Sequence, residues 1–146
     1  MDDGKKFKKL IIYTDGGARG NPGPAGIGAV AYDENKEIVF EVSEFLGVAT
    51  NNQAEYKAVI RALEKAKEAG VAELQFFLDS ELVVKQLNRE YKVKNAELAP
   101  LFLKINDLAV GFKKINYCHI RRELNKEADK LANRAMDEGT GKNGKI

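Results

Sequence analysis

A helical stretch between two short apolar strands is the feature that most limits how this chain can fold. Residues 7–15 end in the apolar run LIIY, which is typical of a strand buried on both faces. Capping residues at 50–52 begin a helical pattern that continues to Ala69 and ends at Gly70. An apolar strand over 73–79 follows. Because a long helix separates the two strands, we expect them to lie parallel in one sheet.

The remaining segments extend this core into a mixed sheet. Residues 16–26 are rich in Gly and Pro and predict a loop. Strands predicted over 27–32 and 37–46, with a polar turn at 33–35, indicate an antiparallel meander with the first strand. Further along the chain we expect helices over 80–89, 96–110 and 125–137, the last with Asn125 as its cap, and a final strand over 114–120.

The length of 146 residues corresponds to about one domain. We therefore expect a single α/β domain over residues 1–138. The sequence after it, 139–146, has almost no apolar content and predicts a disordered tail.

Composition excludes several classes of protein. Cys118 is the only cysteine, so no intramolecular disulfide can form, and we expect its thiol to be packed in an apolar strand. No apolar run approaches the roughly 20 residues that cross a bilayer, and the first nine residues lack the apolar segment of a secretion signal. We expect a cytoplasmic protein without membrane contact. The net charge of +2 is lower than a general DNA-coating protein would carry.

Four acidic residues occupy unusual positions. Asp15 and Asp79 each end an apolar strand, and ligands of open α/β sheets gather beyond the carboxyl ends of the strands. Glu55 shares its helix face with Val59 and other apolar residues, where an acid is rarely buried without a partner. Asp129 lies at the edge of the apolar stripe of the last helix. Each has a purely structural alternative, because Asp commonly begins turns and acids stabilise first helical turns.

If these four side chains meet, their chemistry is restricted. Carboxylates gathered in one cleft repel each other and have raised pKa values unless cations occupy the site. Clusters of oxygen ligands favour Mg²⁺ or Mn²⁺ over zinc. Two such ions, held about 3.5–4 Å apart, can stabilise the attacking and the leaving oxygen of a phosphodiester. The convergence of the four acids is therefore the hypothesis to test.

Other motifs carry less weight. Residues 26–31 match the GxGxxA dinucleotide fingerprint, but that motif must follow a strand and begin a helix, whereas these residues are themselves predicted to be a strand. The sequence contains neither a GK[ST] phosphate loop nor HExxH. His119 is the only histidine, and nothing places it beside Ser80, which disfavours a Ser/His/Asp triad.

Four segments resemble the type 1 ribonuclease H family. They are YTDGGARGNPGPAGIGAV (13–30), ATNNQAEYKAVIRAL (49–63), LDSELVV (78–84) and ELNKEADKLANRA (123–135). Each segment carries one of the four acids, in the order that the family shows. The resemblance covers most of the chain, from about residue 10 to residue 135.

The resemblance implies a ribonuclease H-like fold, with a five-stranded mixed sheet of three antiparallel strands followed by parallel strands, flanked by helices. It implies endonucleolytic cleavage of the RNA strand of RNA–DNA hybrids, leaving 5′-phosphate and 3′-hydroxyl ends. It also implies two Mg²⁺ ions, or Mn²⁺ in their place. Asp15 would bridge both ions, Glu55 and Asp79 would complete one site, and Asp129 the other. We expect a monomer and leave open whether duplex RNA is also cut.

The resemblance further implies contacts with the substrate. This family reads hybrid shape and 2′-hydroxyl groups across the minor groove rather than base sequence. The matching positions are Gly16, Gly17, Arg19, Asn21, Thr50, Asn51, Asn52 and Asn125. Glycine would permit close approach of the backbone to RNA. Without the resemblance, a plain turn and a plain helix cap would explain the same residues.

Three departures from the family pattern are visible. Glu81 stands where many members have Gln. The connection that carries a basic protrusion in some relatives is short here and offers only Arg89, Lys92 and Lys94. A loop histidine assists catalysis in some relatives, but the setting of His119 predicts a strand end, and we favour Arg122 for that role. The alternatives to a ribonuclease H are a catalytically silent hybrid-binding module and another nuclease of the same fold.

Overall fold

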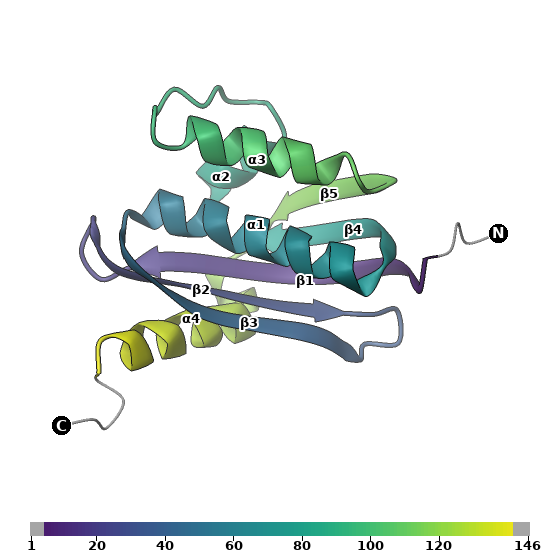
Figure 1. The fold of residues 1–146 in the computed structure, drawn as a ribbon, viewed down its shortest axis with the longest axis horizontal. Coiled ribbons are helices and arrows are strands. Elements are labelled where there is room, and N and C mark those ends of the chain that lie inside the picture. The colour runs from purple at the N-terminus through teal and green to yellow at the C-terminus, as the bar shows by residue number, and fades with distance from the viewer. Residues whose placement is uncertain (1–4, 142–146) are drawn as a thin grey trace.

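The computed structural model describes residues 5–141 and contains one five-stranded sheet with helices on both faces (Figure 1). The elements are β1 (Phe7–Ala18), β2 (Gly23–Tyr32), β3 (Ile38–Ala49), α1 (Asn51–Ala69), β4 (Val71–Leu78), α2 (Glu81–Leu87), α3 (Ala99–Ala109), β5 (Lys114–His119), a 3₁₀ turn (Arg122–Leu124) and α4 (Lys126–Gly139). No helix among these combines the length and apolar character that spanning a membrane requires.

The strand order is β3-β2-β1-β4-β5. The pairs β1–β2 and β2–β3 are antiparallel, whereas β1–β4 and β4–β5 are parallel. This confirms the predicted mixed sheet of three antiparallel strands followed by parallel ones. The parallel pairing of β1 and β4 places the carboxyl ends of both strands at the same edge of the sheet.

Helix α1 forms where the capping residues predicted it. The Thr50 hydroxyl accepts a hydrogen bond from the Gln53 amide, and the Gln53 side chain accepts one from the Thr50 amide, which together form a capping box. Gly70 ends the helix with a φ of 75°, a conformation that favours glycine.

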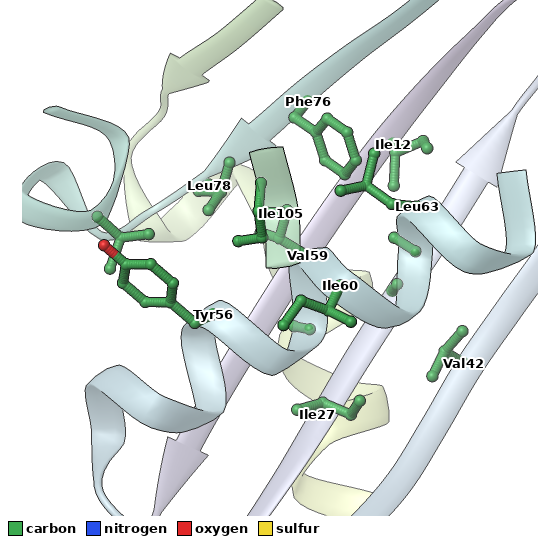
Figure 2. Close-up of a cluster of buried hydrophobic side chains, with 14 of the residues drawn as sticks. Ile12, Ile27, Val42, Tyr56, Val59, Ile60, Leu63, Phe76, Leu78 and Ile105 are labelled. Atoms are coloured by element: carbon green, nitrogen blue, oxygen red, sulfur yellow. The ribbon is translucent and has the colours of Figure 1, made fainter. Parts of the chain in front are cut away.

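The apolar side of α1 packs on the sheet. Val59 and Leu63 lie against Ile12 of β1 and Phe76 of β4 (Figure 2). Ile105 of α3 closes the same cluster from the outer side. The main core of the protein therefore lies between the sheet and the layer of α1 and α3.

The loop predicted over 16–26 is much shorter than expected. Strand β1 continues to Ala18 and β2 begins at Gly23, so only residues 19–22 connect them. The glycines in these strands serve close packing. A Cβ atom on Gly16 would overlap the backbone of Ala54 in α1, and one on Gly28 would overlap the carbonyl oxygen of Ala128 in α4. Gly28 belongs to the GxGxxA match, which is a strand, as predicted.

Two further expectations concern the end of the chain and Cys118. Helix α4 includes Gly139, and the Thr140 hydroxyl donates to the Met136 carbonyl, while residues 142–146 of the predicted tail lie outside the described residues. The expectation of a packed thiol was wrong, because Cys118 is exposed. Its strand, β5, is one of the two edge strands of the sheet.

The contact between Gly28 and α4 is expected to be sensitive to one added methyl group. Gly28→Ala should lower the free energy of unfolding by about 2–3 kcal/mol, because the backbone on both sides of the contact must shift. Chemical denaturation measures this change. Gly111→Ala is the matched control, since its Cβ would lie 3.5 Å from the nearest heavy atom, the Leu108 oxygen. Equal stability of the two variants would contradict the close approach of α4 to β2.

Candidate active site

Three carboxylates meet at the edge of the sheet where β1 and β4 end. Thr14 registers with Leu78 across the parallel pair, so the residues that follow them, Asp15 and Asp79, are neighbours. Glu55 reaches the same place from α1. One ligand oxygen from each of these three acids lies within 4.8 Å of the others. The structure therefore brings together three of the four acids that the sequence singled out.

The position of Glu55 follows from the packing of α1. The absence of a side chain at Gly16 lets the backbone of Ala54 approach β1 directly beside Asp15. Glu55 comes next in the helix and is only 7% exposed. Its Oε1 atom is buried and has no hydrogen-bond partner among the described residues. A buried acid of this kind is costly unless something else compensates its charge.

The raised pKa values of Asp15 and Glu55 also indicate that the negative charges of this cluster are not compensated within the protein. Burial, followed by the charge of Asp79 and the Asp129 side chain, raises the pKa of Asp15 to about 8. Burial, followed by the charges of Asp15 and Asp79, raises the pKa of Glu55 well above its usual range. The positive charge of Arg122 opposes both pKa shifts. Bound cations would relieve the same repulsion.

The residues present fit a hard divalent cation. The donor set consists of carboxylate oxygens, which Mg²⁺ and Mn²⁺ prefer. The unpartnered oxygen of Glu55 is an available ligand atom within that set. The protein thus has a candidate metal centre formed by Asp15, Glu55 and Asp79.

Asp129 stands slightly apart from this triad. It belongs to α4 and is close enough to raise the pKa of Asp15. Its helix is placed by Gly28, which registers with Asp15 across the β1–β2 pair and packs under the Ala128 carbonyl. The Oδ1 atom of Asp129 accepts a hydrogen bond from Asn133 and lies 4.0 Å from the Arg122 guanidinium. Asp129 therefore borders the centre from the opposite face of the sheet to α1.

Asn125 has a different role from the one predicted. The sequence suggested a helix cap, but its side chain makes no capping hydrogen bond. The amide nitrogen instead donates to the Thr14 carbonyl and to Asp79 Oδ2, each at 2.9 Å, and the residue is 1% exposed. Asn125 thus ties the Asp79 carboxylate to the end of β1. An Asn directly before a helix is so commonly a cap that the sequence alone could not distinguish the two roles.

The predicted substrate residues of the first loop and the start of α1 lie side by side. Asn51 Oδ1 accepts from the Ala18 amide at 2.8 Å, and Asn21 Oδ1 accepts from the Asn51 amide at 3.0 Å. These residues border a hollow of about 330 Å³, which is lined by Asn21, Thr50, Asn51, Asn52, Gln53, Asn95, Glu97 and Leu98. Asn95 and Glu97 were not singled out from the sequence, because they come from a separate segment between α2 and α3.

The other predicted site residues lie in different surroundings. Gly17 is half-buried beside Asn51, and Gly16 is buried beneath α1. Arg19 pairs with Asp137 of α4. Arg122 is exposed but lies near Asp129. His119 is exposed at the end of β5, and no hydrogen bond or ion pair joins it to the four acids in the described part of the chain.

Comparisons with known proteins agree with this geometry. The family profile described as Reverse transcriptase-like matches residues 13–135. A ribonuclease H of Clostridium botulinum is 35% identical over 155 residues, covering 90% of this chain and 98% of its own length. A bifunctional protein of Mycobacterium tuberculosis is 44% identical over 130 residues, but the matched region is 88% of this chain and only 36% of that relative.

A solved structure is similar as well. LC11 ribonuclease H1, isolated from compost and crystallised in complex with an RNA/DNA hybrid, is 46% identical, with a TM-score of 0.86. The likeness covers 90% of this chain and 99% of that one.

The repulsion among the acids is expected to appear as a pH-dependent loss of stability without metal. The pKa of Asp15 is about 8 in the folded protein against an ordinary value of 3.8, so the folded state binds this proton more tightly. Its contribution to stability is therefore lost as the pH rises from about 4 to about 8. In EDTA at pH 8, Asp15→Asn should raise the unfolding free energy by about 1–2 kcal/mol, and the gain should shrink toward pH 4.

Thermal unfolding in EDTA across this pH range measures the effect, with Asp107→Asn on α3 as the control. Adding Mn²⁺ at pH 8 should stabilise the wild-type protein more than Asp15→Asn, because the ion replaces the proton. An Asp15→Asn variant less stable than wild type in EDTA at pH 8 would contradict the crowding of charges.

Proposed function

Because the chain belongs to the reverse transcriptase-like family, and within it to the ribonucleases H, we propose that it hydrolyses the RNA strand of RNA–DNA hybrids. The observation that carries this proposal is the group of three carboxylates within 4.8 Å of one another, one of them buried with an unpartnered oxygen. The chain spans about a third of its longer mycobacterial relative, so the proposal concerns this domain.

We propose that Asp15, Glu55 and Asp79 hold one divalent ion and that Asp15 and Asp129 share a second. Ions bound there would activate the attacking water and neutralise charge on the departing ribose 3′-oxygen. Mg²⁺ suits this oxygen-rich set, with Mn²⁺ as a substitute. The products would carry 5′-phosphate and 3′-hydroxyl ends.

The chain's own residues shape this site. Asn125 holds the Asp79 carboxylate toward β1 and limits its rotation. Arg122 places a positive charge beside Asp129. A positive charge there would stabilise the negative charge that accumulates on the phosphodiester as it is attacked. Its side chain is 81% exposed, so it can move toward a bound phosphate. Arg122, rather than His119, is therefore proposed to assist catalysis.

The hollow at the start of α1 is proposed to receive the sugar–phosphate backbone of the hybrid. It lies at a helix N-terminus, where backbone amides and the helix dipole favour an anion. Side-chain amides of several asparagines line it, and such groups commonly contact phosphate and sugar oxygens. Contacts of this kind position a duplex without reading its bases. The LC11 relative binds an RNA/DNA hybrid, which supports the same substrate class here.

A hybrid-binding module without catalysis is the alternative. All four acids are present, and three already meet, which argues against it. Incubating the protein with labelled RNA–DNA hybrid, duplex RNA and duplex DNA, each with Mg²⁺, Mn²⁺ or EDTA, separates the possibilities. The proposal requires cleavage of the RNA strand of the hybrid that EDTA abolishes. Binding of the hybrid without any cleavage would favour the silent module.

Removing any acid of the triad is expected to abolish cleavage. Asp15→Asn, Glu55→Gln and Asp79→Asn should each reduce kcat by at least about 100–1000-fold, since each removes a carboxylate ligand of the cation that would stabilise the transition state. Circular dichroism would show an intact fold. Glu73→Gln, on β4 away from the cluster, is the control and should keep wild-type turnover. Near-normal turnover in any of the three variants would remove that residue from the site.

Asn51→Ala is expected to impair substrate binding more than folding. Thr50, not Asn51, is the helix cap, so the loss of Asn51 should cost little stability. It should raise KM for the hybrid by about 5–10-fold, because it frees the Ala18 amide and loosens the hollow. Thr50→Ala is the comparison and should destabilise the protein by about 1 kcal/mol. If activity of Asn51→Ala falls only in proportion to the folded fraction, Asn51 is a structural residue.

A further inference from the structure

The side chain of Arg19 crosses from the first loop to α4. Its Nη1 atom pairs with Asp137 Oδ1 at 2.6 Å, and its Nη2 atom donates to Asn133 Oδ1 at 3.2 Å. A longer contact of 3.5 Å joins Nη2 to the Asn133 carbonyl. The Arg19 side chain is about two-thirds buried in this position. The side chain of Arg19 is therefore engaged with α4.

Asn133 connects this arginine to the metal centre. Its Nδ2 atom donates to Asp129 Oδ1 at 3.2 Å and to the Asp129 carbonyl at 2.9 Å, one helical turn earlier. A chain of contacts thus runs from Arg19 through Asn133 to Asp129. It joins the loop that follows Asp15 to the acid on the opposite side of the centre.

The chemistry of the three groups determines which of them donates and which accepts each hydrogen bond. A guanidinium has only donors, so Asn133 must turn its amide oxygen toward Arg19. The amide nitrogen then necessarily faces Asp129, which as an ionised carboxylate has only acceptors. Arg19 therefore determines that Asn133 donates to Asp129. A donor at Oδ1 leaves the other carboxylate oxygen of Asp129 free as a ligand.

The remaining contact of Asp129 is weaker. Arg122 approaches Oδ1 only to 4.0 Å, and its side chain is 81% exposed. Exposed pairs of this kind restrict a side chain little. Asn133, in contrast, donates a hydrogen bond to the Asp129 carboxylate at 3.2 Å. Asn133 is thus the side chain best placed to hold that carboxylate in position.

We infer that Asn133, oriented by Arg19, is a positioning residue that holds Asp129 as a ligand for a divalent ion. This inference rests on the proposed function in that it takes Asp129 to be a cation ligand. Groups that orient metal ligands from behind commonly change metal affinity or activity by about 10–100-fold when they are removed.

The decisive variant is Asn133→Ala. A purely structural role for Asn133 predicts a loss of stability, whereas the positioning role predicts a loss of Mn²⁺ affinity in a stable fold. Asn133 lies inside α4, where Ala is the better helix former, so the fold should be as stable as wild type or slightly more stable. Arg19 keeps its ion pair with Asp137 in this variant. The affinity of the Asn133→Ala variant for Mn²⁺ should nevertheless fall about 10-fold. The Mn²⁺ concentration that gives half-maximal kcat should rise by a similar factor, with little change in KM for the hybrid.

Mn²⁺ binding is measured by calorimetry on the full chain without substrate, together with thermal unfolding. Arg19→Ala should weaken Mn²⁺ binding in the same direction and add nothing in an Asn133→Ala background, since both act through one contact. Asn133→Gln, which keeps the amide on a longer arm, should recover part of the affinity. Arg134→Ala is the control: it changes the exposed neighbouring residue of the same helix and should leave Mn²⁺ binding unchanged.

The outcomes separate this inference from the proposed function. Wild-type Mn²⁺ affinity in Asn133→Ala, or full additivity of the Arg19 and Asn133 substitutions, would overturn the positioning role even if the hybrid is cleaved. If the protein binds Mn²⁺ in a manner that depends on Asp129 and Asn133 but cleaves no hybrid, the proposed reaction fails and the positioning role stands. If Asp129→Asn binds Mn²⁺ as wild type does, Asp129 is no ligand and the inference falls.

Discussion

The repulsion among acids gathered at one sheet edge is the constraint on which the rest of this structure depends. Asp15, Glu55 and Asp79 come within 4.8 Å of one another although burial and mutual charge raise the pKa values of Asp15 and Glu55. Such an arrangement costs stability in the absence of cations. The fold therefore has to supply enough packing energy elsewhere to hold the acids in place until ions or protons compensate them.

Three packing features provide that support. The parallel pairing of β1 with β4 brings Asp15 and Asp79 to the same edge. Close contact at Gly16 sets α1, and with it Glu55, against the end of β1. Close contact at Gly28 sets α4 and Asp129 against the other face. Buried amides then fix the carboxylates individually, as Asn125 does for Asp79. The two glycines are thus important because they have no side chain that would separate helix from strand.

The sequence allowed the layout of the site to be predicted but not its supporting contacts. Hydrophobic periodicity and the cap at Thr50 located the strands and α1, and an acid on the apolar face of α1 marked Glu55. The side chains of Arg19 and Asn125 bind partners that lie more than 100 residues away along the chain. Local patterns carry no information about such partners. The loop over 16–26 is shorter than its glycines predict, because Gly16 lies in a strand and, like Gly28 in the neighbouring strand, allows a helix to approach closely.

Crystallography with Mn²⁺, using the anomalous signal of the metal, tests the central claim most directly. We expect an ion bound to oxygens of Asp15, Glu55 and Asp79, with these side chains in nearly the positions they have here, and a second ion near Asp129. Carboxylates that point away from each other, with no anomalous density between them at saturating Mn²⁺, would contradict it.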